Sequence, residues 1–132
     1  MPSKEEVFVG VQQALVEALA VDESEVTPEA TLQGDLGAES IDILDIFYRL
    51  EKTFSIKIDR GELMPEDIVN DQTERYVSKD GKLTPEGLVE LKKRMPSADL
   101  SAFEKNPAIT NLMSILTVKD MCYLVENKLG IA

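Results

Sequence analysis

The segment SIDILDIFYRL, which begins at Ser40, constrains the fold more than any other part of the chain. Its largest apolar residues recur at intervals of three and four positions, at Ile43, Ile46, Phe47 and Leu50. This spacing places them on one face of an α-helix, because about 3.6 residues complete a turn. We therefore predict a helix from Ser40 to about Thr53. Three more apolar residues widen this face, so the helix is expected to contact something on two sides: Ile41, Leu44 and Tyr48.

The first helix is predicted over residues 4–20. Ser3 is a suitable N-cap, and Glu6 three residues later completes a capping box. The apolar residues behind this cap recur at helical spacing: Val7, Val11, Ala14, Leu15 and Ala18. The next polar stretch predicts a long loop, because it contains Pro28, Gly34 and Gly37. Three apolar residues are expected to hold this loop against the core: Val26, Leu32 and Leu36.

The last helix is predicted over residues 118–129. Thr117 with Asp120 forms its start signal, and Gly130 is a typical residue after a helix end. Its apolar stripe consists of Val118, Met121, Cys122, Val125 and Leu129. Because Cys122 lies on this stripe, we interpret it as a buried structural thiol rather than a nucleophile.

The stretch between the second and last helices has weaker patterns. Residues 54–58 (FSIKI) favour a short extended segment, and residues 64–70 favour one or two helical turns. Asp80-Gly81 predicts the two-residue turn of a short β-hairpin. Thr84-Pro85 predicts a helix that runs to about Met95. Short helical pieces separated near Pro107 are expected before the last helix.

Length and composition fit one small helical domain. The chain has 132 residues, which suits a single domain. Aromatic residues are only 5% of the chain, so the core must be built mainly from aliphatic side chains. We predict an all-α fold, a small bundle of three to four helices. Residues 59–116 form an additional inserted segment within this single domain, 1–132.

The charge balance restricts the partners. The chain has 25 acidic and 14 basic residues and a net charge of −11. Such a surface repels nucleic acid and anionic membranes, and it attracts proteins with basic patches. Residues 1–60 hold 13 acids and 5 bases, whereas residues 61–132 hold 12 and 9. The N-terminal half is therefore the expected docking half.

Several kinds of site are excluded. The chain has no histidine and one cysteine, so it can form neither a histidine-based catalytic triad nor an internal disulfide, and it lacks the usual zinc ligands. A calcium loop that begins at Asp22 fails, since Thr27 replaces the required glycine and Gln33 the final glutamate. We expect no metal and no catalytic apparatus. With no signal core and no apolar run of membrane length, we expect a cytoplasmic monomer without stable membrane insertion.

Ser40 has two interpretations. It is either the N-cap of the predicted helix, which stabilises by about 1 kcal/mol, or a site of modification. The surrounding segment DLGAESIDILD, residues 35–45, resembles the phosphopantetheine attachment motif of acyl carrier proteins. Matching positions are Asp35, Leu36, Gly37, Ser40, the aliphatic Ile41, and the acids Asp42, Asp45 and Glu51. The resemblance covers about residues 4–58 and 116–129.

The resemblance implies an acyl-carrier-type bundle that is not an enzyme. A phosphopantetheinyl transferase would move 4′-phosphopantetheine from coenzyme A to Ser40, which would then carry acyl groups as thioesters between enzymes of lipid biosynthesis. The chain departs from the family pattern at Glu39, where aspartate is usual, and in the length of residues 59–116. A serine beside a glycine turn at a helix start is expected to be exposed. It has no neighbouring base, so a separate enzyme must activate it.

Two groups of residues are candidates for partner and cargo contacts. Acids around Ser40 would steer enzymes with basic docking patches. The docking candidates are Asp35, Asp42, Asp45, Tyr48 and Glu51, with Glu39 and Ile41 beside the attachment serine. The candidates for an acyl cleft are Leu44, Ile46 and Phe47. Ile41, Leu44 and Tyr48 fit either a partner contact or the mouth of such a cleft.

The inserted segment indicates a specialised carrier. By analogy with family members that depart from the common form in this half, it would enlarge the acyl cleft or select a partner, as in carriers that deliver acyl chains to lipopolysaccharide. A carrier of polyketide or peptide synthesis, or an unmodified acidic helical adaptor, is the alternative. The sequence identifies neither the acyl group nor the pathway.

Overall fold

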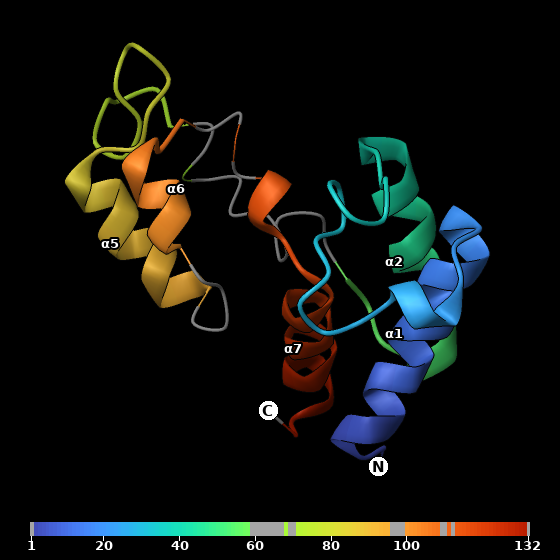
Figure 1. Ribbon diagram of the computed structural model, residues 1–132. Helices are drawn as coiled ribbons and strands as arrows, with labels where there is room; N and C mark the ends of the chain where they lie inside the picture. The colour runs from blue at the N-terminus through green and yellow to red at the C-terminus, as the bar shows by residue number, and fades with distance from the viewer. Residues whose placement is uncertain are drawn as a thin grey trace.

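The structure is a computed structural model, and it describes residues 2–58, 68, 71–95, 100–108, 111 and 113–131. Within these residues the chain is helical, with three isolated antiparallel bridges in place of a sheet. Three helices form a bundle in which α1 (Lys4–Leu19) packs against both α2 (Ser40–Phe54) and α7 (Val118–Leu129). The smaller helices α5 (Pro85–Arg94) and α6 (Ser101–Lys105) lie apart from this bundle, beside a hairpin (Figure 1). The predicted all-α bundle with an added segment is confirmed.

Local capping rules account for the start of α1. The Glu6 N–H donates to Ser3 Oγ at 3.2 Å, and the Ser3 N–H donates to Glu6 Oε1 at 3.1 Å. This is the predicted capping box, and it satisfies two backbone donors that the helix itself leaves unpaired. The face behind it is buried at Val7, Val11, Ala14 and Leu15.

The start of α7 is fixed in the same way and is also joined to the long first loop. Thr117 is the N-cap, and the Asp120 carboxylate accepts the Thr117 N–H at 3.0 Å. Next to this cap, the Leu32 N–H donates to the Leu116 carbonyl at 2.9 Å, and the Val118 N–H donates to the Ala30 carbonyl at 3.0 Å. The short 3₁₀ helices Glu23–Glu25 and Met113–Ile115 lie in the two segments that meet here. The loop before α2 and the chain before α7 therefore share one set of backbone bonds.

The apolar stripe of α2 faces the bundle core as predicted. Its four members are buried: Ile43, Ile46, Phe47 and Leu50. The three loop residues expected to anchor the first loop are buried too: Val26, Leu32 and Leu36. Full burial of such a side chain contributes about 1.5–3 kcal/mol, so this stripe orients α2.

Residues 71–95 and 100–108 form a small lobe of their own: the hairpin, α5 and α6 (Figure 1). Thr84 caps α5 as predicted, since its Oγ1 accepts the Gly87 N–H at 3.0 Å. The same hydroxyl donates to the Arg75 carbonyl at 2.6 Å, which links the helix start to the hairpin. The apolar centre of the lobe contains Val77, Leu83, Leu91, Met95, Leu100 and Phe103.

The hairpin differs in detail from the prediction. Val77 and Leu83 form an antiparallel bridge, and the Ser78 N–H donates to the Lys82 carbonyl at 2.8 Å. Three residues, 79–81, therefore form the loop instead of the predicted two. Gly81 has a φ of +79°, the left-handed conformation that a three-residue hairpin loop requires at this position. The preference of Asp-Gly for a turn was correct, but the register of the turn was wrong.

The remaining predictions for this region have mixed outcomes. Residues 56–58 are coil rather than an extended strand. Of the predicted turns at 64–70, only Ile68 is described; it is helical and fully buried, and the others lie outside the described residues. The pieces α6 and the 3₁₀ turn at 113–115 agree with short helices on either side of Pro107. In the described part of the chain, no helix is long and apolar enough to cross a membrane.

Candidate functional site

The loop that leads to Ser40 is held by a reciprocal pair of hydrogen bonds. The Thr31 N–H donates to Asp35 Oδ2 at 2.8 Å, and the Asp35 N–H donates to Thr31 Oγ1 at 2.9 Å. Leu36 is buried one residue later, and the buried Ala38 donates its N–H to the Leu32 carbonyl at 2.8 Å. Asp35, a predicted docking residue, thus has a structural role in this turn.

Gly37 directs the chain from this turn into α2. Its φ is +72°, and a Cβ placed on it would meet no other atom within 4 Å. The glycine is therefore required by the backbone conformation and not by crowding, because left-handed φ values are unfavourable for other residues. The turn leaves open space directly before the helix start.

The N-cap of α2 is Glu39 and not Ser40. Glu39 has an extended backbone, and its N–H donates to Asp42 Oδ2 at 2.8 Å. Ser40 is the first residue of the helix. The capping interpretation of Ser40 is therefore wrong, because a cap must lie outside the helical backbone and Ser40 lies inside it. The Ser40 side chain is outside the described part of the structure, so its exposure stays a prediction.

One face of α2 presents large apolar side chains to solvent. Ile41 is 73% exposed, Leu44 is 47% exposed and Tyr48 is 54% exposed. Positions 41, 44 and 48 lie on one side of a helix, since they are three and four residues apart. Lys52 continues this row, and its Nζ lies 4.6 Å from the centre of the Tyr48 ring. The residues that widened the predicted stripe are thus directed away from the core.

The predicted docking acids differ in their surroundings. Glu39 is exposed. Asp45 pairs with Arg49 at 3.3 Å, and Arg49 also reaches Glu17 of α1 at 2.8 Å. Glu51 is half-buried, and its Oε2 accepts the Ile58 N–H at 2.8 Å. This carboxylate therefore holds the chain that follows α2.

The acyl-cleft candidates separate into two kinds. Ile46 and Phe47 are buried in the bundle core, whereas Leu44 is on the exposed face. An acyl cleft around these three residues stays a prediction. Sequence patterns also missed two residues that hold the site, Thr31 and Arg49. A threonine four residues before Asp35 was the signal for the first, and an arginine at i+4 from Asp45 was the signal for the second.

Comparisons with known proteins agree with this arrangement. The family model for the phosphopantetheine attachment site matches residues 10–70, a span that contains Ser40. An acyl carrier protein of Thermotoga maritima is 46% identical over 63 residues, which are 48% of this chain and 78% of that protein. An acyl carrier protein of Rubrobacter xylanophilus is 42% identical over 55 residues, 42% of this chain and 68% of that protein. The chain belongs to the acyl carrier protein family.

The family is one of non-catalytic carriers, and the cofactor of this carrier is covalently bound 4′-phosphopantetheine. When bound, the group supplies a flexible arm with a terminal thiol. The start of α2 fits its phosphate, because a helix N-terminus favours an anion. Asp42 fixes this helix start through the Glu39 N–H, and the open space at Gly37 leaves room beside it. Across the described residues, no group of His, Cys, Asp and Glu could hold a metal ion.

The only cysteine of the carrier is buried, as predicted. Burial in the bundle, followed by the charge of Glu126, raises the pKa of the Cys122 thiol to about 12. A thiol with such a pKa is almost entirely protonated at neutral pH and is a poor nucleophile. The reactive thiol of the holo-carrier is therefore that of the cofactor and not that of Cys122.

Proposed function

We propose that Ser40 carries 4′-phosphopantetheine and that the protein shuttles acyl groups between enzymes of fatty-acid-type lipid biosynthesis in the cytoplasm, where coenzyme A supplies the arm. One observation carries this proposal. Ser40 is the first residue of α2, after the Gly37 turn and inside the span of the family match. A phosphopantetheinyl transferase would activate the Ser40 hydroxyl, since the chain has no histidine, the most common base beside a serine nucleophile.

Intact-mass spectrometry after co-expression with a phosphopantetheinyl transferase tests the attachment site. We expect one phosphopantetheine adduct on the natural chain and none on Ser40→Ala. Ser24→Ala is the matched control, since Ser24 lies in the short 3₁₀ helix of the first loop, and it should be modified normally. An adduct that persists in Ser40→Ala would assign the arm to another residue.

We further propose that α2 is the docking helix. Its exposed apolar row at positions 41, 44 and 48 lies beside the acids Glu39 and Asp45. Apolar anchors with a charged rim are typical of protein interfaces, in which rim charges mainly set the association rate. Leu44→Ser should lower kcat/KM of the transferase about fivefold or more. Val89→Ser removes an equally exposed apolar residue from α5 and should have no such effect; equal losses would contradict the assignment to α2.

We propose that residues 59–116 are an insertion within a single carrier domain and that they select partner enzymes, as in a carrier specialised for lipopolysaccharide acyl chains. The separate lobe formed by the hairpin, α5 and α6 supports this proposal, since it adds a second surface to the bundle (Figure 1). Deletion of residues 60–110 tests it with a panel of acyl-transfer enzymes. The shortened carrier should lose some partners and keep others. Unchanged activity with every enzyme would count against a selective role.

A further inference from the structure

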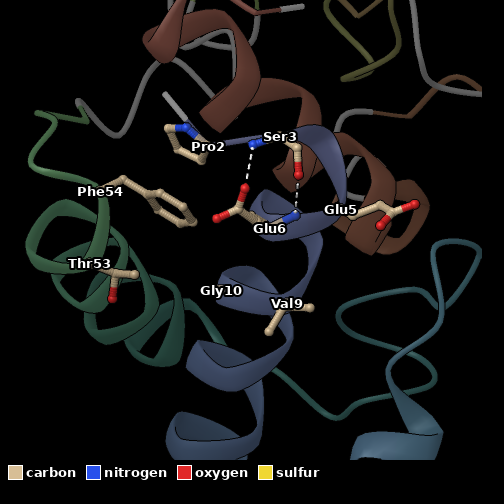
Figure 2. Close-up of a pocket in the computed structure, with 8 residues that line it drawn as sticks. All are labelled: Pro2, Ser3, Glu5, Glu6, Val9, Gly10, Thr53 and Phe54. Carbon is tan, nitrogen blue, oxygen red and sulfur yellow. Dashed lines mark hydrogen bonds between the residues drawn. The ribbon is translucent and has the colours of Figure 1, made fainter.

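A second candidate docking site lies at the end of α2 that is remote from Ser40. A cavity of about 720 Å³ separates the start of α1 from the end of α2 (Figure 2). Its size falls within the range of about 300–1,000 Å³ that is usual for ligand-binding clefts. It is lined by Pro2, Ser3, Glu5, Glu6, Val9, Gly10, Thr53 and Phe54, and we call it the Phe54 cavity.

The walls of the Phe54 cavity are mixed: Phe54, Val9 and Pro2 supply apolar surface, and the remaining side chains are mostly polar. The Phe54 ring points toward α1 in Figure 2, and it packs so closely on Gly10 that a Cβ there would lie 2.4 Å from Phe54 Cζ. Only glycine therefore allows the ring to take this position. Val9 stands at the edge and is 54% exposed. On its other side, Val9 also lines an apolar hollow of about 400 Å³ between α1 and α7, so the surface continues beyond the cavity.

The charges of the cavity are all of one sign. Among the lining residues that the structure describes, Glu5 and Glu6 are acids and none is basic. One oxygen of Glu6 accepts the Ser3 N–H, and Figure 2 shows the other oxygen on the side of Phe54. The helix ends contribute about half a charge each, positive at the start of α1 and negative at the end of α2, and these two nearly cancel. The Glu6 carboxylate therefore leaves a full negative charge on the side of the aromatic ring, whereas Glu5 points to the other side of α1 in Figure 2.

We propose that the Phe54 cavity is a docking site for an arginine side chain of a partner protein. A guanidinium group is planar, stacks on aromatic rings and forms charge-assisted hydrogen bonds with carboxylates. The apolar rim at Val9 and Pro2 fits the residues that flank such an arginine. Ser40 and Phe54 are 14 residues apart in α2, or about 21 Å at 1.5 Å per residue. A partner bound here would hold the carrier while leaving the Ser40 end free for other enzymes.

An NMR titration of the full-length ¹⁵N-labelled carrier tests this proposal. The probe is the peptide acetyl-Gly-Arg-Gly-amide, and the same peptide with glutamine in place of arginine is its control. We expect saturable shifts at the backbone amides of Gly10, Thr53 and Phe54 with the arginine peptide alone. Shifts confined to the start of α2, or shifts of equal size with both peptides, would overturn the assignment.

Matched variants separate a specific site from general attraction to an acidic protein. Glu5→Gln with Glu6→Gln removes both carboxylates but keeps the capping box, because glutamine also serves at that position. Affinity should fall about three- to tenfold. Glu25→Gln with Glu29→Gln removes the same charge from the exposed first loop and should change affinity less than about twofold. If both double variants lost affinity for the arginine peptide equally, the net charge of the protein would explain the binding, and the proposed site would be refuted.

A third variant tests the aromatic wall. Phe54→Leu keeps an apolar side chain against Gly10 but removes the π face, so affinity for the arginine peptide should fall about two- to fivefold. Affinity that is unchanged in Phe54→Leu would contradict the stacking geometry. Modification of Ser40 by the transferase, at the other end of α2, should be the same for all these variants. This readout separates failure of the proposed arginine site from failure of the proposed carrier function.

Discussion

The bundle and the inserted lobe use charge in different ways. Residues 1–60, which supply α1 and α2, hold 13 acids and 5 bases, and exposed acids such as Glu39 lie beside exposed apolar residues. The described residues of the lobe, 71–95 and 100–108, hold 6 acids and 7 bases. Several of the lobe charges pair internally, as Lys92 does with Glu104 and Arg75 with Glu86. The bundle thus carries an excess of acidic residues, whereas the lobe is nearly balanced and uses several of its charges to hold its own parts together.

Because the ion pairs of the lobe join its own parts, we expect the lobe and the bundle to unfold separately. Cys122 reports on the bundle alone, because it is buried in α7. Its pKa of about 12, against an ordinary value of 9.0, lowers the thiolate fraction at pH 8 about a thousandfold. Iodoacetamide should therefore alkylate the native protein about a thousandfold more slowly than the protein in guanidinium chloride. Native and unfolded rates within tenfold of each other would contradict this burial.

Gly87→Ala should damage the lobe without affecting the bundle. An added Cβ would lie 2.3 Å from the Tyr76 carbonyl oxygen, and this backbone atom cannot easily move aside. We expect a loss of about 1–3 kcal/mol, measured by thermal denaturation with circular dichroism. Cys122 should stay protected in this variant. Glu86→Ala, at the neighbouring position, removes only a surface ion pair and should cost less than about 1 kcal/mol.

Two threonine caps allow the same substitution to be compared in the two regions. Thr84 caps α5 in the lobe and Thr117 caps α7 in the bundle, each through a side-chain oxygen. Replacement of either residue by alanine should cost about 1 kcal/mol. Only Thr117→Ala should raise the alkylation rate of Cys122. If Thr84→Ala raised it equally, the two regions would be one cooperative unit.

The smallest effect is expected from pH. Hydrogen bonds from the Thr73 side chain and then from the Tyr76 backbone lower the pKa of Asp71 to about 2 from its ordinary 3.8. A carboxyl group with a lowered folded-state pKa stabilises the lobe above pH 3.8 and loses this effect as the pH falls toward 2. Asp71→Asn should therefore lower the melting temperature of the lobe at pH 5 but not at pH 2. Asp22→Asn, in the first loop, is the control and should show no such difference.

Local signals predicted most of the fold. Capping boxes at Ser3 and Thr117 and the Thr84-Pro85 pair located three helix starts correctly, because each satisfies backbone donors through nearby residues. The start of α2 was misread at its cap, since serine is a far commoner N-cap than glutamate. The structure places the cap one residue earlier, where Asp42 accepts the Glu39 N–H.

Features that depend on distant parts of the chain could not be predicted in this way. The hairpin register follows from tertiary contacts, since the Leu83 N–H donates to the Pro107 carbonyl at 2.7 Å. Periodicity placed Phe47 on the core-facing stripe of α2 but left Tyr48 open between a partner contact and a cleft mouth, because its exposure depends on what the neighbouring helices cover. The Phe54 cavity joins residues more than forty positions apart and left no local signal.

The backbone seam between residues 30–32 and 116–118 has a consequence for exchanging lobes between carriers. At this seam the chain enters α7, and the same bonds hold the loop that leads to Ser40. A chimera that re-enters at Leu116 in register would keep the Thr31–Thr117 bridge, and the loop before α2 would keep its support. Lobes of different size could then be grafted at the same junction, whereas a graft displaced by one residue would break the bonds of Leu32 and Val118 that hold the loop before α2.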